Sequence, residues 1–347
     1  MRNLATQFLL RAWQGRSLWV WPLLPVAWLY QLILQLRRAL FALAWRRVER
    51  PAVCVVVVGN VVAGGAGKTP TVLSVVAHLR AQGWSVGIIS KGYGRSESTT
   101  KEVLIDAPVQ TVGDEALLLR QRSGASVFVG PSREGSLKAL LGAYPQTRIV
   151  VCDDGLQDYG LYRDVEICMM HEAGLGNGFL LPAGPLREPW PRKPLACSGV
   201  NDAQLLIVSS GVALPGQFAT RRSLGTVARQ ADGSCRALRK LRADPALKAV
   251  AAIARPAQFF SMLQQAGLTL AAQEALPDHA DFAGRDRASF GAYTLLCTEK
   301  DAAKLWAIAP DAWAVPLEQS LDESFYAALD ARVAAAWAGR LSLPHGH

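Results

Sequence analysis

The hydrophobic positions between residues 53 and 209 form short continuous runs that alternate with helix-like stretches. Runs of mainly apolar residues lie at 53–58, 84–90, 126–129, 148–153, 164–170 and 203–209. Continuous apolar runs of this length are typical of strands buried on both faces of a parallel sheet. Helical patterns at 72–79 and 116–121 lie between the runs. We therefore predict an α/β fold with a mostly parallel sheet.

A second, smaller α/β unit is expected after residue 200. A polar stretch with hairpin-like strands runs through positions 226 and 236. Further strands are predicted at 247–254 and 293–298, with a helix at 259–266 between them. The chain has 347 residues, half of them hydrophobic, which is enough for two modest domains with separate cores.

The first fifty residues have a different pattern. After Pro22 and Pro25, the polar positions 31, 35, 38, 46 and 49 fall near one helical face, opposite the apolar positions 29, 33, 36, 40 and 43. This arrangement favours an amphipathic helix that lies in a membrane surface. A spanning helix, which needs about 20 apolar residues, and an ordinary buried helix pair are the alternatives. A signal peptide is disfavoured, because Arg37 and Arg38 separate the apolar run from the cleavage-like site at 42–44.

The basic charge of the chain is concentrated in the same segment. The net charge is +9, but residues 1–50 contain eight arginines and one glutamate, which leaves only +2 for the rest of the chain. Five of the ten tryptophans also lie there. Arg and Trp beside an apolar stretch indicate a lipid interface with anionic headgroups, and not a nucleic-acid partner.

The six cysteines occur singly, without a C-x-x-C pair and without pairing with histidine. Such cysteines are usually small buried hydrophobic residues in a reducing compartment. We therefore expect a cytosolic body and no structural zinc.

A glycine-rich turn, reading GNVVAGGAGKT from 59 to 69, joins the first predicted strand to the first helix. It departs from the strict G-x-x-x-x-G-K-[ST] motif because position 62 is Val. Glycines let backbone N–H groups surround a polyphosphate, Lys68 would contact its β- and γ-phosphates, and Thr69 would contact Mg²⁺. We predict a nucleotide site formed by Val62, Ala63, Gly64, Gly65, Ala66, Gly67, Lys68 and Thr69.

Two aspartates, Asp153 and Asp154, end the apolar run at 148–153. An apolar strand that ends in Asp at the carboxyl edge of a parallel sheet is the Walker B arrangement. We predict that one of the two binds Mg²⁺, directly or through water, and the sequence leaves open which one.

Other charged groups are candidates for chemistry. Asp114 and Glu115 open a predicted helix, where carboxylates either cap the backbone or serve as a base and a metal ligand. Arg187 ends a loop rich in Pro and Gly and is either an anion clamp or a surface residue. His279 is flanked by acids, as a candidate base or as an exposed side chain. A basic glycine-rich turn at 91–95 is a further phosphate candidate.

In these motifs the chain resembles the tetraacyldisaccharide 4′-kinase family. The resemblance is carried, in order from residue 59 to 305, by GNVVAGGAGKTP, SKGYGR, GDE, DDGLQ, LLPAGPLREP, LPDH and TEKDAAKL. The chain departs from the family at GDEA where GDEP is usual, at Asp158 where His is common, and at AIARPAQFF in place of GIGNPERFF. None of these removes a proposed catalytic group, but the third affects a loop whose glycines are expected to serve domain closure.

The resemblance implies residue roles. It places a catalytic Asp-His dyad at Asp114 and His279, in which Asp114, oriented by or sharing its proton with His279, is expected to accept the hydroxyl proton. It makes Glu115 a further metal candidate and Arg187 a phosphate or transition-state contact. The implied nucleotide and metal residues are Gly64, Gly65, Gly67, Lys68, Thr69, Asp153, Asp154 and Gln157.

The resemblance also implies an organisation of the chain. We expect an N-terminal membrane-associated helical segment (1–50), a P-loop kinase core (51–200), a two-stranded linker region (201–236), a smaller α/β domain (237–325), and a C-terminal helix and tail (326–347). The active site would lie in the cleft between the core and the smaller domain.

The implied activity is ATP-dependent phosphorylation of the 4′-hydroxyl of a tetraacylated glucosamine disaccharide 1-phosphate, giving lipid IVA in lipid A assembly. ATP and Mg²⁺ are the expected cofactors and the lipid disaccharide the expected partner, with no obligate protein partner. The expected location is the cytoplasmic face of the bacterial inner membrane, either peripheral or anchored by a single helix. The alternative is a membrane-associated P-loop ATPase switch of the partitioning or metallochaperone type, although Ala63 stands where that class has its signature Lys.

Overall fold

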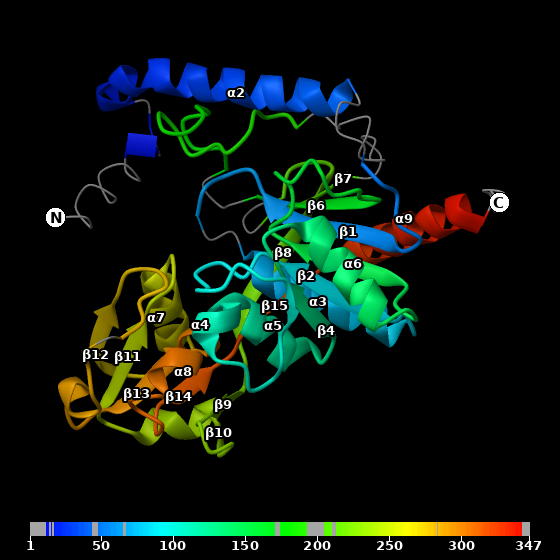
Figure 1. Cartoon of the computed structure of the whole chain (residues 1–347). Coiled ribbons are helices and arrows are strands. Elements are labelled where there is room, and N and C mark those ends of the chain that lie inside the picture. The colour runs from blue at the N-terminus through cyan, green and yellow to red at the C-terminus, as the bar shows by residue number, and fades with distance from the viewer. Residues whose placement is uncertain are drawn as a thin grey trace.

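The computed structural model describes residues 12–13, 15, 17–43, 48–64, 67–170, 174–192, 205–209, 213–282 and 284–341. Two sheets organise these residues, and the predicted α/β fold with mostly parallel strands is confirmed. Figure 1 shows the two units that form around the sheets, with the N-terminal helix along the outside of the larger one.

The first unit is built on a nine-stranded sheet of order β15-β8-β7-β6-β1-β5-β2-β4-β3. All neighbours are parallel except the pairs β15–β8 and β3–β4. Its strands are β1 (Cys54–Asn60), β2 (Val86–Ser90), β3 (Lys101–Glu102), β4 (Ser126–Val129), β5 (Ile149–Asp153), β6 (Val165–Met170), β7 (Leu205–Ser209), β8 (Gln217–Leu224) and β15 (Leu317–Leu321).

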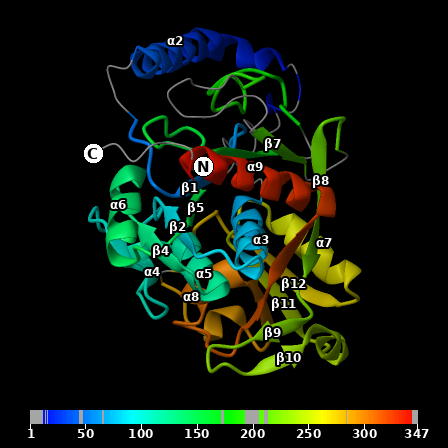
Figure 2. The same ribbon diagram turned by 90° about the vertical axis from the view of Figure 1, so that its right-hand side faces the viewer.

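Strand β1 is buried on both faces, which explains its continuous run of valines. Val56 and Val58 pack on the face covered by α3 (Lys68–Ala81), α5 (Asp114–Ser123) and α9 (Glu323–Leu341). Val55 and Val57 pack on the other face, against α6 (Arg133–Ala143) and the N-terminal helix. Figure 2 shows α9 and α3 together on one side of this sheet.

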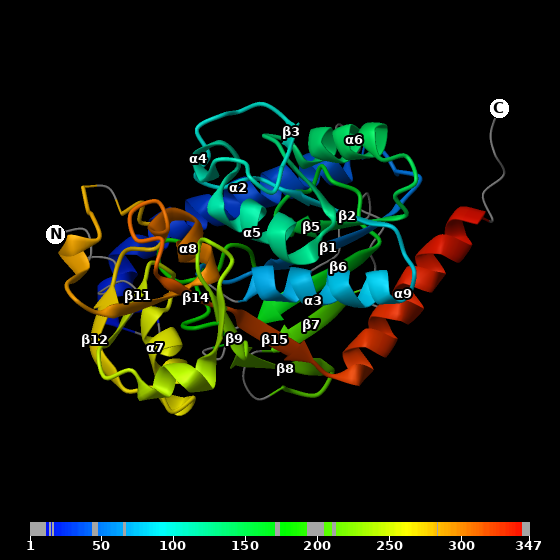
Figure 3. The same cartoon turned by 90° about the horizontal axis from the view of Figure 1, so that it is seen from below.

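The second unit contains a six-stranded sheet of order β10-β9-β14-β13-β11-β12. Its strands are β9 (Val227–Arg229), β10 (Cys235–Ala237), β11 (Leu247–Ala251), β12 (Leu270–Ala275), β13 (Thr294–Thr298) and β14 (Trp313–Val315). Its helices are η4 (Leu238–Ala243), α7 (Pro256–Gln265), η5 (Ala288–Phe290) and α8 (Glu299–Leu305). Figure 3 shows α8 facing α5 of the first unit, and these two helices are in contact.

The connection between the units differs from the expected linker at 201–236. Strands β7 and β8 belong to the first sheet, whereas β9 and β10 belong to the second. The partner of β8 in the connection is β15, which pairs antiparallel with it and lies in the range expected for the smaller domain. Local pattern could not reveal this, because strand pairing depends on tertiary contacts far along the chain.

The N-terminal segment contains a short 3₁₀ helix, η1 (Leu18–Leu23), which continues into α2 (Leu24–Ala42). By length and composition, Leu18–Ala42 is apolar enough to cross a membrane, with a mean hydropathy of 1.3. The predicted apolar face of this helix points outward, because Leu29, Ile33 and Leu36 are between 54% and 61% exposed. Its opposite side packs on the first unit through Ala27 and Leu34.

Candidate active site

The glycine-rich turn carries Lys68 at the start of α3. Gly67 precedes the helix with a φ of 82°, a conformation that favours glycine. Lys68 Nζ lies 3.4 Å from Asn60 Oδ1 and 3.7 Å from Asp154 Oδ1. Asn60 also donates to the carbonyl of Gly64 at 3.2 Å, so it holds both sides of the turn. The amide of Asn60 was not among the predicted site residues.

The other predicted residues of the turn have different surroundings. Val62 forms an isolated β-bridge with Leu186, and the backbone N–H of Ala63 donates to Pro185 O at 2.7 Å. These two positions therefore attach the turn to the loop 174–192. Gly65 and Ala66 lie outside the described residues. Thr69 lines a cavity together with Lys68.

Asp153 ends β5 beside the phosphate turn, since Val58 of β1 is paired with it in the parallel register. Its Oδ2 accepts a hydrogen bond from Ser90 at 3.3 Å, while its buried Oδ1 has no hydrogen-bond partner among the described residues. Burial raises the pKa of Asp153, and the nearby carboxylates of Glu115 and Asp154 raise it further. A cation would satisfy the orphaned oxygen and relieve this repulsion.

Asp154 faces two cations. Arg187 Nη1 donates to its Oδ1 at 3.1 Å and its Oδ2 at 3.3 Å, and Lys68 Nζ lies 3.7 Å from the same Oδ1. Asp154 has a φ of 49°, which is uncommon for a residue with a side chain. The structure therefore brings Arg187 to the phosphate turn, as its expected role requires.

The side chain of Gln157 is engaged by other protein groups. Its Nε2 donates to Asn60 O at 3.0 Å and to Glu188 Oε1 at 2.9 Å. Glu188 is fully buried and is also held by Arg192 Nε at 3.1 Å. In this structure Gln157 thus fixes the end of β1 against the loop 174–192.

The expected dyad is brought together across the two units. His279 Nδ1 lies 3.0 Å from Asp114 Oδ2, although the residues are 165 positions apart. Asp114 begins α5, and His279 sits in the loop after β12 with a φ of 63°. The ring of Tyr93 lies 5.2 Å from the imidazole, centroid to centroid.

Both oxygens of Asp114 are engaged. Oδ1 accepts from the backbone N–H of Glu115 at 2.9 Å, and Oδ2 accepts from Lys304 Nζ at 2.7 Å as well as from His279. Burial raises the pKa of Asp114, but the hydrogen bond with His279, the charge of Lys300 and the hydrogen bond with Lys304 outweigh it and hold that pKa below its ordinary value. The bond to Asp114 in turn raises the pKa of His279.

Two lysines that were not predicted as site residues complete the cluster. Lys300 Nζ lies 3.1 Å from Glu115 Oε1 and 3.3 Å from His279 Nε2. Lys300 and Lys304 are one turn apart on α8 and face the dyad together. The spacing of the lysines in TEKDAAKL puts both on one helix face, so this signal was present in the sequence.

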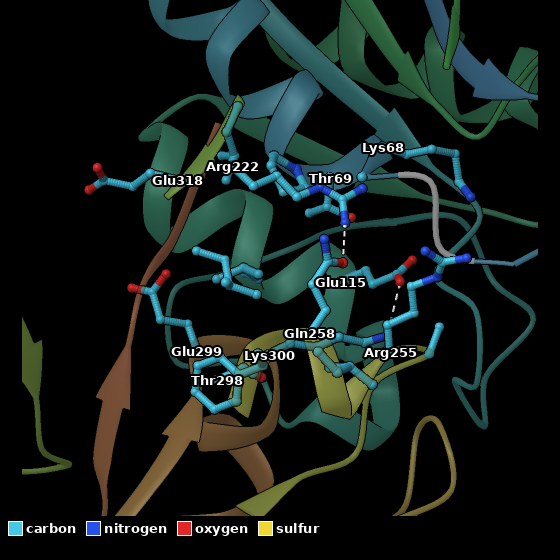
Figure 4. Close-up of a pocket in the computed structure, with 18 of the residues that line it drawn as sticks. Lys68, Thr69, Glu115, Arg222, Arg255, Gln258, Thr298, Glu299, Lys300 and Glu318 are labelled. Carbon is cyan, nitrogen blue, oxygen red and sulfur yellow. Dashed lines mark hydrogen bonds and ion pairs between the residues drawn. The ribbon is translucent and has the colours of Figure 1, made fainter. Parts of the chain in front are cut away.

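Two cavities meet at this cluster. The smaller, of about 180 Å³, is lined by Lys68, Thr69, Glu115, Arg222, Arg255 and Lys300. Figure 4 shows the first-unit residues Lys68 and Thr69 on one side and the second-unit residues Arg255 and Lys300 on the other. The larger, of about 1160 Å³, is lined by Asp114, His279 and Lys304, and Asp278 borders both.

No group of three or more His, Cys, Asp or Glu side chains could hold a metal by itself in the described ranges. Mg²⁺ usually needs only one or two carboxylates, because waters and substrate phosphates supply the other ligands. The orphaned Oδ1 of Asp153, next to the phosphate turn, fits this kind of site.

Comparisons with known proteins agree in the family they indicate. A family model described as tetraacyldisaccharide-1-P 4′-kinase (LpxK) matches residues 19–334. The chain is 49% identical to the tetraacyldisaccharide 4′-kinase of Acidovorax sp. strain JS42, with 93% of both chains covered. It is 48% identical to that of Polaromonas naphthalenivorans, with 98% of both covered.

One solved structure has a similar fold. It is the crystal structure of an "apo" form of LpxK from Aquifex aeolicus in complex with ATP. The TM-score is 0.75 at 24% identity, with 91% of this chain and 99% of that chain covered. At this identity the likeness shows the fold.

Proposed function

The chain belongs to the tetraacyldisaccharide-1-P 4′-kinase family, and from this premise we propose how its residues carry out the reaction. It is an ATP-dependent kinase that phosphorylates the 4′-position of a tetraacylated disaccharide in lipid A assembly. The family match does not favour the ATPase-switch alternative. The observation that carries the proposal is the dyad of Asp114 and His279, which stands beside the cavity that begins at Lys68.

The donor site is the smaller cavity. Lys68 and the N-terminus of α3 would hold the β- and γ-phosphates of ATP. Thr69 and Asp153 would hold Mg²⁺, with Asp154 and Glu115 nearby, and the ion supplies charge neutralisation of the phosphates when bound. Arg187 now pairs with Asp154 and would turn its guanidinium to the transferring group.

The acceptor hydroxyl would be activated by the dyad. A lysine ammonium can only donate, so a hydrogen bond from Lys300 to His279 Nε2, 3.3 Å away, requires a lone pair on that nitrogen. We infer that the neutral imidazole carries its proton on Nδ1 and donates it to Asp114. The side chain of Asp114 is 3% exposed, whereas that of His279 is 25% exposed. We therefore propose that the accepting atom is His279 Nε2 and not, as expected from the sequence, the carboxylate of Asp114, which orients the ring and stabilises the imidazolium.

The N-terminal helix would hold the enzyme on the cytoplasmic surface of the inner membrane. Leu18, Trp19 and Trp21 are between 61% and 80% exposed, next to the outward apolar face of α2. Exposed apolar surface of this extent is costly in water but matches the interface of a bilayer. The acceptor lipid would be reached there, because a substrate with four acyl chains is almost absent from water.

The test uses purified full-length protein, Mg-ATP and the detergent-solubilised disaccharide 1-phosphate. We expect ADP release that requires the lipid and 4′-phosphorylated product in equal amount. The variant Lys68→Met should lack this activity, because it loses the cation nearest the phosphate turn. ADP release that is independent of the lipid would contradict the proposal and favour a nucleotide switch.

A further inference from the structure

Lys300 joins the two parts of the site. It lies in the first turn of α8, which Thr298 caps by accepting from Asp301 N. From this position its side chain crosses the boundary between the units and reaches Glu115 of α5. The same side chain lines the smaller cavity with Lys68 and Thr69 (Figure 4). Its Nζ also lies 3.3 Å from His279 Nε2, and Asp278, which lines the same cavity, lies 3.8 Å from that nitrogen.

The surroundings of Lys300 keep it charged. Its side chain is 15% exposed, and its Nζ lies 3.1 Å from Glu115 Oε1 and 3.3 Å from Asp278 Oδ1. Burial alone would lower the pKa of Lys300, but these acids and Asp114 outweigh it and raise that pKa. The site therefore presents a desolvated ammonium ion between acceptor base and donor cavity.

The ammonium group of Lys300 occupies the position that the reacting alcohol must take. An alcohol that gives its proton to His279 Nε2 must come within about 3 Å of that nitrogen, where Lys300 Nζ now lies. The alcohol must at the same time face the γ-phosphorus in the cavity of Lys68. An arriving alcohol would displace the ammonium ion toward Glu115 and the cavity, where the transferring group carries its charge.

We propose that Lys300 is a further catalytic residue, whose ammonium group donates to the oxygens of the phosphoryl group during transfer. The inference rests on the proposed function. In the step, the alcohol oxygen forms a bond to the γ-phosphorus and the bond from that phosphorus to the bridging oxygen of ADP breaks. The alcohol proton goes to His279 Nε2, and ADP keeps the electron pair. Lys300 keeps all its protons.

The competing explanation is that Lys300 only fastens α8 to α5. A second ion pair on the same interface separates the two explanations, since Arg122 Nη1 binds both carboxylate oxygens of Glu299 at 2.7 and 2.8 Å. This pair is partly exposed and does not contact the dyad. Arg122→Met therefore removes a link between the units while Lys300 keeps its contacts, and it is the matched control.

The test compares Lys300→Met with the wild type and with Arg122→Met in the lipid-dependent assay. We expect kcat of Lys300→Met to fall about 10²- to 10³-fold, as when a donor to a transition state is removed. The affinities for ATP and ADP should change less than about threefold, because the loss is confined to the transition state. Binding of ADP with aluminium fluoride and lipid, which imitates that state, should weaken in parallel with kcat. Arg122→Met should retain wild-type kcat.

A chemical rescue makes the comparison within one folded protein. Lys300→Cys alkylated with 2-bromoethylamine regains an ammonium group at nearly the same position, and should recover at least tenfold in kcat. The wild type treated in the same way controls for Cys235, which is exposed. Unchanged kcat in Lys300→Met, a loss found only in ATP affinity, or no recovery on alkylation would overturn the inference. If the wild type itself shows no lipid-dependent ADP release, the proposed function fails instead.

Discussion

The substitution Asp114→Asn tests the dyad with little change in shape. The amide oxygen can still accept from the N–H of Glu115, as Oδ1 does now at 2.9 Å. The amide nitrogen, however, would face His279 Nδ1 and the ammonium group of Lys304, which now lie 3.0 and 2.7 Å from Oδ2. Donors would thus face donors, and the charge that stabilises the imidazolium would be lost.

The expected magnitudes follow from these contacts. General-base catalysis contributes about 10²- to 10⁴-fold to a rate, and His279 loses most of it without the carboxylate that orients its ring and stabilises the imidazolium. We therefore expect kcat to fall by about this amount, with ATP affinity nearly unchanged. Breaking a fully buried ion pair costs about 3–5 kcal/mol of unfolding free energy. The side chains of His279 and Lys304 are 25% and 13% exposed, so solvent screening reduces the expected loss to about 1–3 kcal/mol.

The loss of stability should depend on pH in a defined direction. The pKa of Asp114 is lowered in the folded state, so its contribution is present above the ordinary Asp value of about 3.9 and is lost only as pH falls through the lowered value. The pKa of His279 is raised, so its contribution is complete below about 6.5 and is lost as pH rises through the raised value. The difference between wild type and variant should therefore be largest between about pH 4 and 6.5.

The assays are steady-state kinetics with saturating lipid, and urea unfolding at pH 5.5 and 8.5. The control is Glu323→Gln, which removes an exposed acid that lines neither cavity and should change neither result. Asp114→Asn activity within threefold of the wild type would refute the dyad. A stability difference that is equal at both pH values would refute the coupling of the two charges.

Three further variants test the phosphate turn, the buried charges and the proposed membrane surface. Gly67→Ala should weaken ATP binding at least tenfold by calorimetry, because alanine is strained at a φ of 82° and its Cβ, 2.6 Å from Arg222 Nη2, would also displace that guanidinium. Arg192→Met removes the cation that the buried Glu188 and Glu166 share. It should lower the free energy of unfolding in urea by about 3–5 kcal/mol. The control Lys138→Met, at an exposed position, should leave the urea midpoint unchanged. Ile33→Glu with Leu36→Glu should abolish sedimentation with anionic vesicles and leave ATP affinity unchanged; vesicle binding equal to wild type would contradict the membrane role of α2.

Strands of the first sheet were largely predictable, because burial on both faces requires continuous apolar runs. The predicted 126–129 coincides with β4, and the predicted 164–170 differs from β6 by one residue. The pairing of β15 with β8 was not predictable, since the two strands are distant in the sequence and neither is fully buried. Their residues alternate between exposed and covered positions, a pattern that does not identify a partner.

The site residues also fall into a predictable and an unpredictable group. Lys68, Thr69 and Asp153 follow from local motifs, because a phosphate turn and the end of a neighbouring parallel strand must meet at one sheet edge. The contact of His279 with Asp114 comes from the packing of one unit on the other, and only the family resemblance indicated it. Asn60 reads as an ordinary polar residue until its contact with Lys68 is seen.

The loop 174–192 connects α2 to the phosphate turn. On its outer side, Tyr30 of α2 donates to Arg187 O at 2.8 Å, and Arg38 lies 3.9 Å from Glu188. On its inner side, Arg187 binds Asp154 at the phosphate turn. Figure 1 shows α2 directly above this loop. With the membrane role proposed for α2, these contacts would fix the height of the ATP phosphates above the bilayer surface.

The second unit, and not α2, positions the base of the dyad relative to the donor site. His279 belongs to the second unit, which is joined to the first by β8 and β15 and touches it through α5 and α8. A movement of the second unit as a whole on the first would change the distance from His279 to the donor site, while the donor site stays attached to α2 through the loop 174–192. Lys300 and Lys304 of α8 lie on this contact and pair with Glu115 and Asp114 of α5. These lysines can hold the two acids near His279 only while the two units are in contact.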